Sequence, residues 1–346
     1  MKEVLIEDFQ TIANSEVHFD ALKNKTFMIT GATGLVGSLL VKFLLYANEN
    51  CDLNANILAV VRNPEKADKI YDQEKTEKLQ YIVADLATDP IPYDGDCDFV
   101  IHAASVTASK VMVSNPVGTI RTAIDGTEKM LQFAVKKNVQ TFIYISSMEI
   151  YGQPKTEGKT TEKDLGYVDI GTVRSCYPEG KRMCECLCTA YAAQYGLNVV
   201  SARLAQTFGA GILPTEGRVF AQFAKSAVNG EDIVLHTTGE SEGNYVYTAD
   251  AIRAILLLLT EGKSGEAYNI ANEESHITIR HMAELVAEEI ADNKIKTIID
   301  IPEDSASLGY APPVKMWLDA SKMQNLGWKP NVGLIEAYRR MICWMQ

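Results

Sequence analysis

The chain has 346 residues, of which 47% are hydrophobic and 23% charged, a composition typical of a globular protein with a well-buried core and about two domains. A formal net charge of −12 excludes a broad nucleic-acid-binding surface, because no basic stripe offsets the acidic residues. The longest apolar run, Ala254 to Leu259, is too short to cross a bilayer, and the acidic N-terminus lacks the pattern of a signal peptide. We therefore expect a cytoplasmic protein that binds neither membranes nor nucleic acid.

Strand-like and helix-like segments alternate along the chain after a polar lead-in. Short apolar strands are expected at Thr26–Thr30, Ile57–Val61, Gln80–Ala84, Phe99–His102, Thr141–Ser146 and Asn198–Ala202. Helices are expected around Glu3–Ala13 and at Leu35–Ala47, Gly118–Asn138 and Tyr177–Tyr195. Because buried strands that alternate with helices form parallel sheets, the pattern predicts an α/β fold with a Rossmann-type, doubly wound sheet.

The alternation breaks beyond Arg203, where turns with Gly and Pro separate mixed segments. We therefore expect an N-terminal extension over residues 1–23, a dinucleotide-binding domain over 24–205 with about 237–268, and a smaller α/β substrate-binding region over 206–236 and 269–346. Ligands of such sheets bind beyond the carboxyl ends of the strands, so the smaller region is expected to close the site. The sequence indicates no role for the extension.

A glycine-rich segment follows the first strand and opens a helix. It reads Thr30-Gly31-Ala32-Thr33-Gly34-Leu35-Val36-Gly37. The first glycine allows a tight turn, the second lets the backbone approach a pyrophosphate, and the third allows close packing of the helix on the sheet. Rather than a purely structural turn, we expect a dinucleotide phosphate site formed by Gly31, Thr33, Gly34, Leu35, Val36 and Gly37.

The ends of later strands add candidate cofactor contacts. These are Asp85 and Leu86, placed to meet the adenine, together with Ala103, Ala104, Ser105 and Ser146. An NAD site usually carries an acidic residue after the second strand, but Arg62 stands there and favours the 2′-phosphate of NADP through a bidentate ion pair. Arg62 would otherwise stack on the adenine or face water. NAD and NADP therefore both stay open, with a slight preference for NADP.

Three of the seven cysteines lie two residues apart within one expected helix. Cys184 and Cys188 share a face of that helix, with Cys186 between them, but no second cluster completes a zinc site. We expect buried or partly buried free thiols and no metal.

The same helix carries a Tyr-x-x-x-Lys pattern at Tyr177 and Lys181. The i, i+4 spacing places both side chains on one face, and an ammonium group beside a phenol lowers the pKa of the tyrosine by stabilising the phenolate. Such a tyrosine can take the proton of a sugar hydroxyl while hydride leaves the same carbon. Together with Ser146-Ser147 one strand earlier and the glycine loop, the pattern indicates a dehydrogenase-type site rather than a surface pair.

These motifs resemble those of the extended short-chain dehydrogenases, the NAD-dependent epimerase/dehydratase group, over nearly all residues from Lys25 onward. The similar stretches are the glycine loop, His102 to Ala104, Ser147 to Gly152, Tyr177 to Lys181 with Glu185, Arg203 to Gly209, Tyr245 to Asp250 and Leu326 to Pro330. The resemblance implies that Ser147 bonds the reacting sugar oxygen, that Tyr177 is the acid/base and that Lys181 binds the nicotinamide ribose. It also implies a nucleotide-sugar substrate and a homodimer formed through the helices at Gly118–Asn138 and Tyr177–Tyr195.

Within this group, Arg174 to Arg182 and Gly217 to Val219 are most similar to UDP-glucuronate decarboxylases. Glu149 stands where such enzymes keep an acidic residue beside the sugar, and it would orient the sugar or move a proton at C5 once C4 is a ketone. The alternative for Glu149 is a solvent-facing charge at the end of a strand. The expected substrate contacts are Thr107, Glu149, Arg174, Gln206 and Arg218.

The substrate half departs from the family pattern. Met148 replaces the acid by which related dehydratases expel the C6 hydroxyl, and Gly243 replaces an arginine that contacts a diphosphate or a carboxylate. A later arginine is missing around Tyr310 to Pro313, and Ala123 and Gln206 replace two asparagines. The candidates to supply the lost charge are Arg174, Arg218 and Lys315.

We therefore expect an enzyme that oxidises C4 of a nucleotide sugar with bound NAD(P) and then epimerises, decarboxylates or dehydrates the keto intermediate. Met148 weighs against dehydration and Gly243 against decarboxylation, which leaves epimerisation as the preferred outcome. An NADPH-dependent reductase of a keto-sugar or aldehyde is an alternative that suits Arg62. A non-catalytic NAD(P)-sensing protein on the same fold is a further alternative, against which the intact Ser–Tyr–Lys set argues.

Overall fold

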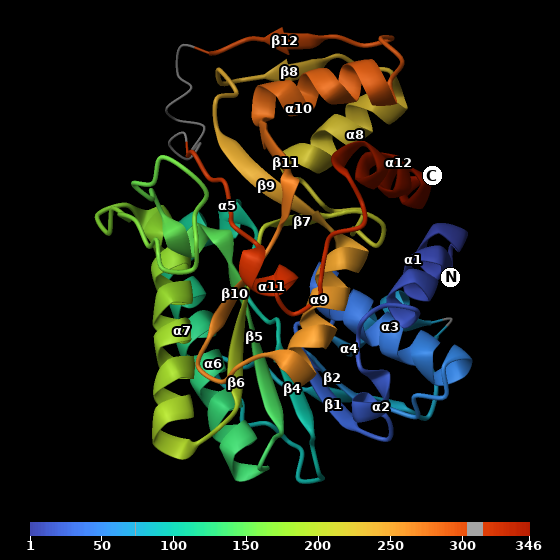
Figure 1. The fold of residues 1–346 in the computed structure, drawn as a ribbon, viewed down its shortest axis with the longest axis vertical. Coiled ribbons are helices and arrows are strands. Elements are labelled where there is room, and N and C mark those ends of the chain that lie inside the picture. Colours follow the sequence, from blue (N-terminus) through green and yellow to red (C-terminus); the bar gives the residue numbers. More distant parts are fainter. Residues whose placement is uncertain (73, 303–313) are drawn as a thin grey trace.

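A seven-stranded parallel sheet forms the centre of the fold in the computed structural model, which describes residues 1–72, 74–302 and 314–346. Its strand order is β10-β6-β5-β4-β1-β2-β3 (Figure 1). The strands are β1 (Thr26–Thr30), β2 (Asn56–Val61), β3 (Leu79–Val83), β4 (Phe99–His102), β5 (Thr141–Ser147), β6 (Val199–Leu204) and β10 (Ala267–Ile270). The predicted Rossmann-type α/β fold is confirmed, and every predicted strand is present with ends shifted by about two residues at most.

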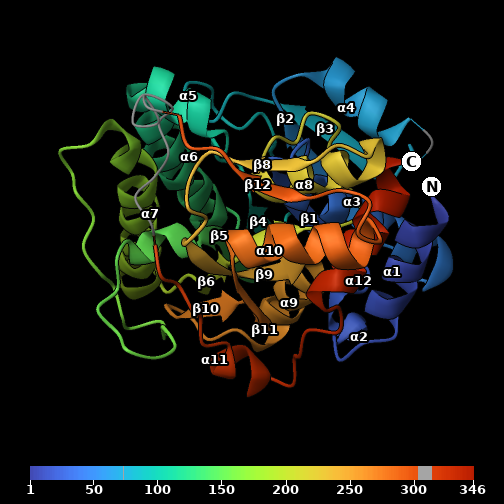
Figure 2. The ribbon, with the colours of Figure 1, turned by 90° about the horizontal axis from the view of Figure 1, so that it is seen from above.

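Helices cover both faces of this sheet (Figures 1 and 2). One face packs against α3 and α9, and the other against α6 and α7. These helices are α3 (Leu35–Asn50), α6 (Pro116–Lys136), α7 (Cys176–Tyr195) and α9 (Thr248–Glu261). Phe27 and Ile29 of β1 belong to the core beneath α3, whereas Met28 between them belongs to the core beneath α6. Because successive side chains of a strand point to opposite faces, this apolar run is that of a strand buried on both sides.

A smaller region lies above the carboxyl ends of the large sheet (Figures 1 and 2). It contains a three-stranded sheet of order β11-β9-β7 and a parallel pair of β12 and β8. The strands are β7 (Gln206–Phe208), β8 (Ile233–Leu235), β9 (Glu242–Tyr247), β11 (Asn272–Thr278) and β12 (Thr297–Ile299). The helices are α8 (Val219–Asn229), α10 (Ile279–Leu285), η3 (Val286–Ile290), α11 (Ser321–Gln324) and α12 (Leu334–Met345). After β9 the chain returns to the large sheet through α9 and β10. The domain limits given by the sequence stay a prediction.

Short helices connect the strands and the longer helices. The connecting helices are α2 (Phe19–Leu22), α4 (Pro64–Tyr71), α5 (Ser109–Ser114), η1 (Met148–Tyr151) and η2 (Val173–Ser175). The segment Tyr310 to Pro313, from which an arginine is missing, lies outside the described residues.

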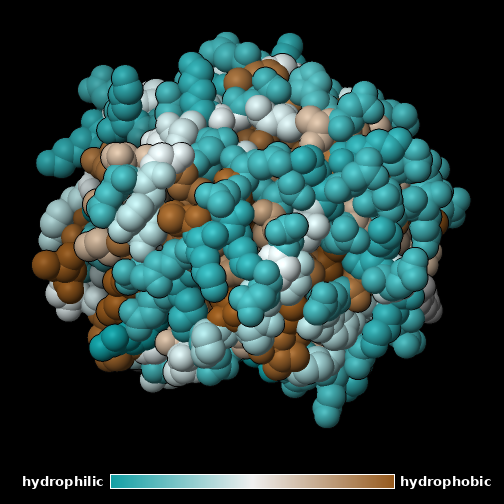
Figure 3. Space-filling view, turned by 90° about the horizontal axis from the view of Figure 1, so that it is seen from below, coloured by the Kyte–Doolittle hydropathy of each residue, from teal (hydrophilic) through white to brown (hydrophobic). Residues whose placement is uncertain are grey.

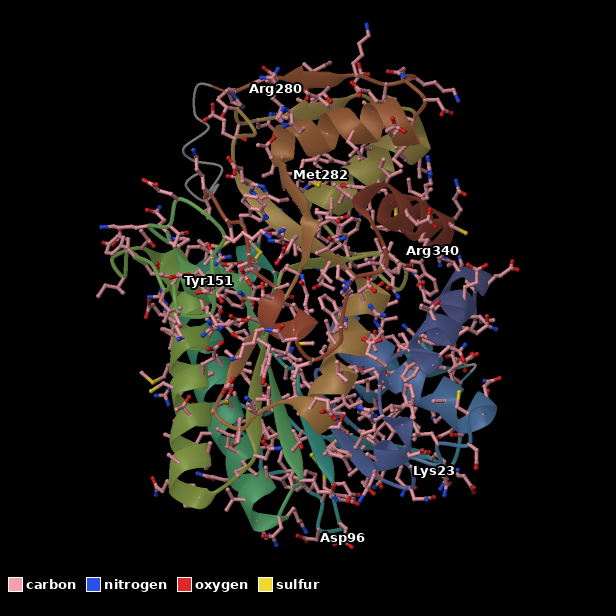
Figure 4. The ribbon with its side chains drawn as sticks, viewed as in Figure 1. Lys23, Asp96, Tyr151, Arg280, Met282 and Arg340 are labelled. Atoms are coloured by element: carbon pink, nitrogen blue, oxygen red, sulfur yellow. The ribbon has the colours of Figure 1, made fainter. Side chains whose placement is uncertain are left out.

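The N-terminal segment packs into the core through α1 (Glu3–Ala13), which is the helix predicted there. Its apolar side chains are buried against α3, α9 and α12. The buried carboxylate of Asp8 accepts a hydrogen bond from the Tyr247 hydroxyl at 2.6 Å and one from Arg340 at 3.0 Å. Arg340 reaches from α12 toward α1, near both chain termini (Figure 4). The segment therefore connects β9 and the C-terminal helix.

The cysteines of α7 differ in exposure. Cys184 and Cys188 are buried, as expected, whereas Cys186 is exposed, which corrects the expectation for that residue. The reason is that two residues of a helix separated by two positions point to nearly opposite sides.

Within the described ranges, no helix is long and apolar enough to span a membrane. Seen from below, the surface is largely hydrophilic with separate apolar patches (Figure 3).

Candidate active site

The glycine loop joins β1 to α3 with a backbone shape that requires glycine. Gly31 has a φ of 65°, and a Cβ there would lie 2.8 Å from backbone atoms of Ala103 and Ala104. A Cβ on Gly37 would collide with the carbonyl group of Gly31. The N-terminus of α3 begins after Gly34 and has no side-chain cap, so its first N–H groups can bind a phosphate. This cradle fits the pyrophosphate of a dinucleotide.

Other residues of the loop and of β5 are placed beside this cradle. Thr33, Leu35 and Val36 are half-buried along the loop. The Ser146 hydroxyl, near the end of β5, is buried and has no hydrogen-bond partner among the described residues. A buried hydroxyl without a partner is costly, so a polar ligand group that pairs with it would stabilise the protein. This orphan hydroxyl is a second feature that fits a bound cofactor.

The turn after β4 is held by a buried hydrogen-bond chain that sequence reasoning missed. The Ala104 N–H donates to the Thr30 hydroxyl at 3.0 Å, and that hydroxyl lies 2.7 Å from Nδ1 of His102. Nε2 of His102 lies 3.1 Å from the Thr127 hydroxyl of α6. Burial lowers the pKa of His102 to about 3, so the ring is neutral. The chain fixes the glycine-loop strand to the β4 turn, where Ala103, Ala104 and Ser105 are half-buried and Thr107 is exposed.

Arg62 and Asp85 lie beside each other after the ends of β2 and β3. Nη1 of Arg62 is 3.9 Å from Oδ2 of Asp85, and the Arg62 side chain is 73% exposed. An exposed pair of this length contributes little stability and leaves the guanidinium able to bind a ligand. Leu86, by contrast, is buried and packs against Gly126 of α6.

Tyr177 and Lys181 lie on one face of α7, as the spacing predicts. The ammonium group of Lys181 donates to the Ile145 carbonyl at 2.7 Å and lies 5.8 Å from the centre of the Tyr177 ring. Burial lowers the pKa of Lys181 to about 8. Burial also raises the pKa of Tyr177 to about 12, and the charge of Glu149 adds to this rise. The raised pKa of Tyr177 is opposite to the lowered pKa that the sequence predicts, because burial outweighs the nearby ammonium group. A cationic nicotinamide near the phenol would lower the Tyr177 pKa, because it favours the phenolate.

Ser147 and Glu149 reach the same place from the end of β5. The Ser147 side chain limits the rise of the Tyr177 pKa, which indicates that the two hydroxyls lie close to each other. Both carboxylate oxygens of Glu149 accept hydrogen bonds from Nη2 of Arg174, at 2.7 and 3.0 Å. Two residues after Glu149, the buried hydroxyl of Tyr151 donates to Asn269 at 2.6 Å and anchors the segment between α7 and the sheet (Figure 4). Glu149 is thus ion-paired rather than a free solvent-facing charge.

The small region contributes Arg218 and Gln206. The charge of Arg218 lowers the pKa of Tyr177 slightly, after the larger effects of burial, Glu149, Ser147 and Arg174. Its Nη2 donates to Glu216 at 2.7 Å, and this pairing helps keep the pKa of Glu216 low despite burial. Gln206 is half-buried and opposite Tyr245 across β7 and β9. Sequence reasoning missed Glu216, although its position two residues before Arg218 offered a signal.

Two departures from the family pattern come together in space. Met148 begins η1, between Ser147 and Glu149, and Gly243 lies in β9. A Cβ on Gly243 would lie 3.5 Å from the Met148 methyl group, which is ordinary van der Waals contact. The sequence offered no sign of this contact, because η1 and β9 lie far apart along the chain.

A doubly wound sheet with this glycine loop and a Tyr–Lys pair at its carboxyl edge defines an enzyme of the short-chain dehydrogenase type. Residues 27–271 match the model of the NAD dependent epimerase/dehydratase family, and the chain belongs to this family. It is 30% identical to UDP-glucuronic acid decarboxylase 6 of Arabidopsis thaliana over 315 residues, which are 90% of this chain and 86% of that relative.

Solved structures show the same fold. A UDP-glucose 4-epimerase from Thermotoga maritima with UDP-glucose matches with a TM-score of 0.76 and 22% identity, covering 92% of this chain and 98% of the other. A UDP-glucuronic acid 4-epimerase from Bacillus cereus in complex with UDP-glucuronic acid and NAD matches with a TM-score of 0.74 and 20% identity, covering 92% and 98%.

Proposed function

We propose that the protein epimerises a nucleotide sugar by oxidising and then reducing its C4. The observation that carries this proposal is the meeting of Ser147, Tyr177 and Lys181 at the carboxyl edge of the sheet, beside an intact glycine loop. The nucleotide sugars bound or acted on by the relatives supply the substrate class. 

The proposed chemistry assigns one task to each side chain. A nicotinamide bound beside the glycine loop would accept hydride from C4 and return it. Tyr177 takes the proton of the C4 hydroxyl, Ser147 bonds the same oxygen, and Lys181 stabilises the phenolate and binds the nicotinamide ribose. Glu149, held by Arg174, orients the sugar while C4 is a ketone.

The cofactor and substrate contacts extend this assignment. We propose that Gly31, Thr33, Gly34, Leu35, Val36 and Gly37 hold the pyrophosphate, and that Arg62, Asp85, Leu86, Ala103, Ala104, Ser105 and Ser146 contact the rest of the cofactor. Thr107, Arg174, Gln206 and Arg218 contact the substrate. Met148 offers no proton for loss of water, and Gly243 offers no cation for loss of carbon dioxide, so epimerisation is the preferred outcome.

Product masses test the proposed reaction. The purified protein is incubated with NAD⁺ or NADP⁺ and a panel of UDP-, CDP-, GDP- and dTDP-sugars that includes UDP-glucuronate. An unchanged mass with altered chromatographic retention is expected. Loss of carbon dioxide or of water would identify a decarboxylase or a dehydratase instead.

Arg62 supports NADP as the preferred cofactor. Its exposed guanidinium stands where NAD sites usually carry an acid, and it can pair with a 2′-phosphate. Arg62→Gln should weaken NADP⁺ binding by about tenfold or more and leave NAD⁺ binding unchanged, as measured by calorimetric titration.

The same residue, Arg62, supports the second candidate function, an NADPH-dependent reductase. Steady loss of NADPH absorbance with a keto-sugar or an aldehyde would favour that function.

The exposed apolar residues of α6 and α7 support a homodimer. Val117 of α6 is 68% exposed and Met183 of α7 is 49% exposed, and α6 and α7 pack side by side. Val117→Asp with Met183→Asp should give a monomer by light scattering, whereas Val234→Asp, which also charges an exposed valine, should not.

We also propose a cytoplasmic location and the domain limits given by the sequence.

A further inference from the structure

A buried hydrogen-bond chain leads from the turn after β4, through α6, to α7. Its first links, from the turn through His102 to the Thr127 hydroxyl, are those that fix the turn to the glycine-loop strand. The Thr127 hydroxyl also donates to Sγ of Cys184 at 3.3 Å, and the Cys184 thiol donates to the Ala123 carbonyl at 3.2 Å. Cys184 lies about one helical turn after Lys181 on α7. The four side chains of the hydrogen-bond chain are at most 1% exposed: Thr30, His102, Thr127 and Cys184.

The α7 end of the hydrogen-bond chain determines where its protons lie. A carbonyl only accepts, so the Cys184 thiol donates its proton to Ala123 and the Thr127 hydroxyl donates its own to Cys184. The Thr127 oxygen is then left to accept a hydrogen bond from Nε2 of His102, which lies at 3.1 Å. Nε2 of His102 therefore carries a proton.

The other end of the hydrogen-bond chain leaves Nδ1 of His102 without a proton. The Ala104 N–H only donates, so the Thr30 oxygen accepts there, and the Thr30 hydroxyl keeps its own proton for Nδ1 at 2.7 Å. Burial, and after it the charge of Lys181, lowers the pKa of His102 to about 3. The Lys181 ammonium group lies 4.8 Å from the centre of the Tyr144 ring, and the His102 ring packs against the same ring with centres 5.9 Å apart. Geometry and charge therefore indicate the same neutral ring, with its proton on Nε2.

We propose that His102 is a positioning residue that, as the neutral ring protonated on Nε2, holds the turn Ala103–Ser105 in place relative to α7. This inference rests on the proposed function, which assigns the turn to the cofactor and α7 to the reacting sugar. Backbone atoms of this turn lie close to Gly31, so movement of the turn would change the cradle for the pyrophosphate. His102 acts through the turn and is assigned no contact with the cofactor or the sugar.

Substitutions at Thr127 break and restore the hydrogen-bond chain outside the proposed site. Thr127→Val keeps the shape of the side chain and removes the hydroxyl that accepts from Nε2. NAD⁺ or NADP⁺ affinity should therefore fall by about threefold or more, the size of one lost buried hydrogen bond. Thr127→Ser keeps the hydroxyl and should bind the cofactor like the wild type. Calorimetric titration measures the affinities, and thermal unfolding shows whether each variant folds.

The outcomes separate this inference from the proposed function. A folded Thr127→Val variant that binds the cofactor as tightly as the wild type would overturn the inference, because a merely structural role costs stability alone. Equal weakening by Thr127→Ser would overturn it too, since that variant keeps the hydroxyl. Failure of the wild type to bind either NAD⁺ or NADP⁺ would instead overturn the proposed function, and this inference with it.

Imidazole NMR of the wild type tests the protonation of His102 directly and decides the matter if Thr127→Val does not fold. Histidine is labelled with ¹⁵N, couplings to the ring C–H protons distinguish the two nitrogens, and the His102 signals are those lost in His102→Gln. Nε2 should carry the proton and Nδ1 should be bare from about pH 5 to pH 8, because the pKa of the ring lies below this range. A proton on Nδ1, or on both nitrogens, within this range would overturn the inference.

Discussion

The two halves of the proposed active site are built in different ways. The cofactor half depends on backbone shape, since Gly31 and Gly37 leave no room for a Cβ and the N-terminus of α3 is uncapped. The substrate half depends on side chains brought from distant segments, such as the Arg174–Glu149 pair and the Met148–Gly243 contact. A site formed by backbone atoms accepts a dinucleotide of one shape. A site formed by side chains can change its ligand by substitution of single residues. The fold therefore keeps its cofactor while its sugar specificity changes.

The substitution with the largest expected effect separates the two halves. Tyr177→Phe removes the proposed acid/base and should reduce turnover by about 10²- to 10⁴-fold. Cofactor affinity should stay unchanged, because the glycine loop is untouched. Turnover of the sugar nucleotide and calorimetric titration of cofactor measure the two properties. A protein that senses NAD(P) without catalysis would show no change in its response, and that result would contradict the assignment.

A glycine substitution should damage the cofactor half alone. Gly31→Ala places a Cβ 2.8 Å from the backbone of Ala103 and Ala104 at a φ of 65°. The left-handed backbone alone costs a side chain roughly 1–2 kcal/mol, so cofactor affinity should fall by about tenfold or more. Gly158→Ala is the matched control, since a Cβ there meets no atom within 4 Å. Equal cofactor affinity in both variants, measured by titration, would contradict the cradle.

The pH dependence of stability should report on how α1 joins β9 to the C-terminal helix. Burial raises the pKa of Asp8 from 3.8 to about 6. The folded state therefore binds this proton more tightly than the unfolded state, and stability is lost as the pH rises from about 4 to 6, by at most about 3 kcal/mol. Asp8→Asn removes this term, so the variant should gain unfolding free energy relative to the wild type over that pH range.

Urea unfolding of both proteins between pH 4 and pH 7 measures the difference. Glu336→Gln removes another partner of Arg340, at 2.9 Å, without removing the buried acid. It serves as the control and should show no such trend. A relative loss of stability in Asp8→Asn as the pH rises would show that the Arg340 ion pair outweighs burial.

Sequence patterns predicted the parts of the fold that local chemistry determines. Strand limits followed from short apolar runs, and the positions of Gly31 and Gly37 followed from a contiguous motif. The contact between Met148 and Gly243 was not predictable, because no local pattern fixes which residues of distant segments meet. The burial of Asp8 was equally hidden: the segment reads as polar, and only its packing against Tyr247 and Arg340 explains the acid. The exposure of Cys186 follows from helix geometry alone and was within reach of the sequence.

In the proposed reaction, hydride leaves C4 of the sugar and returns to it. The most direct test uses a nucleotide sugar carrying deuterium at C4, incubated with the protein and a limiting amount of cofactor, followed by mass analysis of substrate and product. The account predicts an epimer of unchanged mass that retains the deuterium over many turnovers per cofactor. Deuterium that accumulates in released, reduced cofactor, with an oxidised sugar as product, would contradict it.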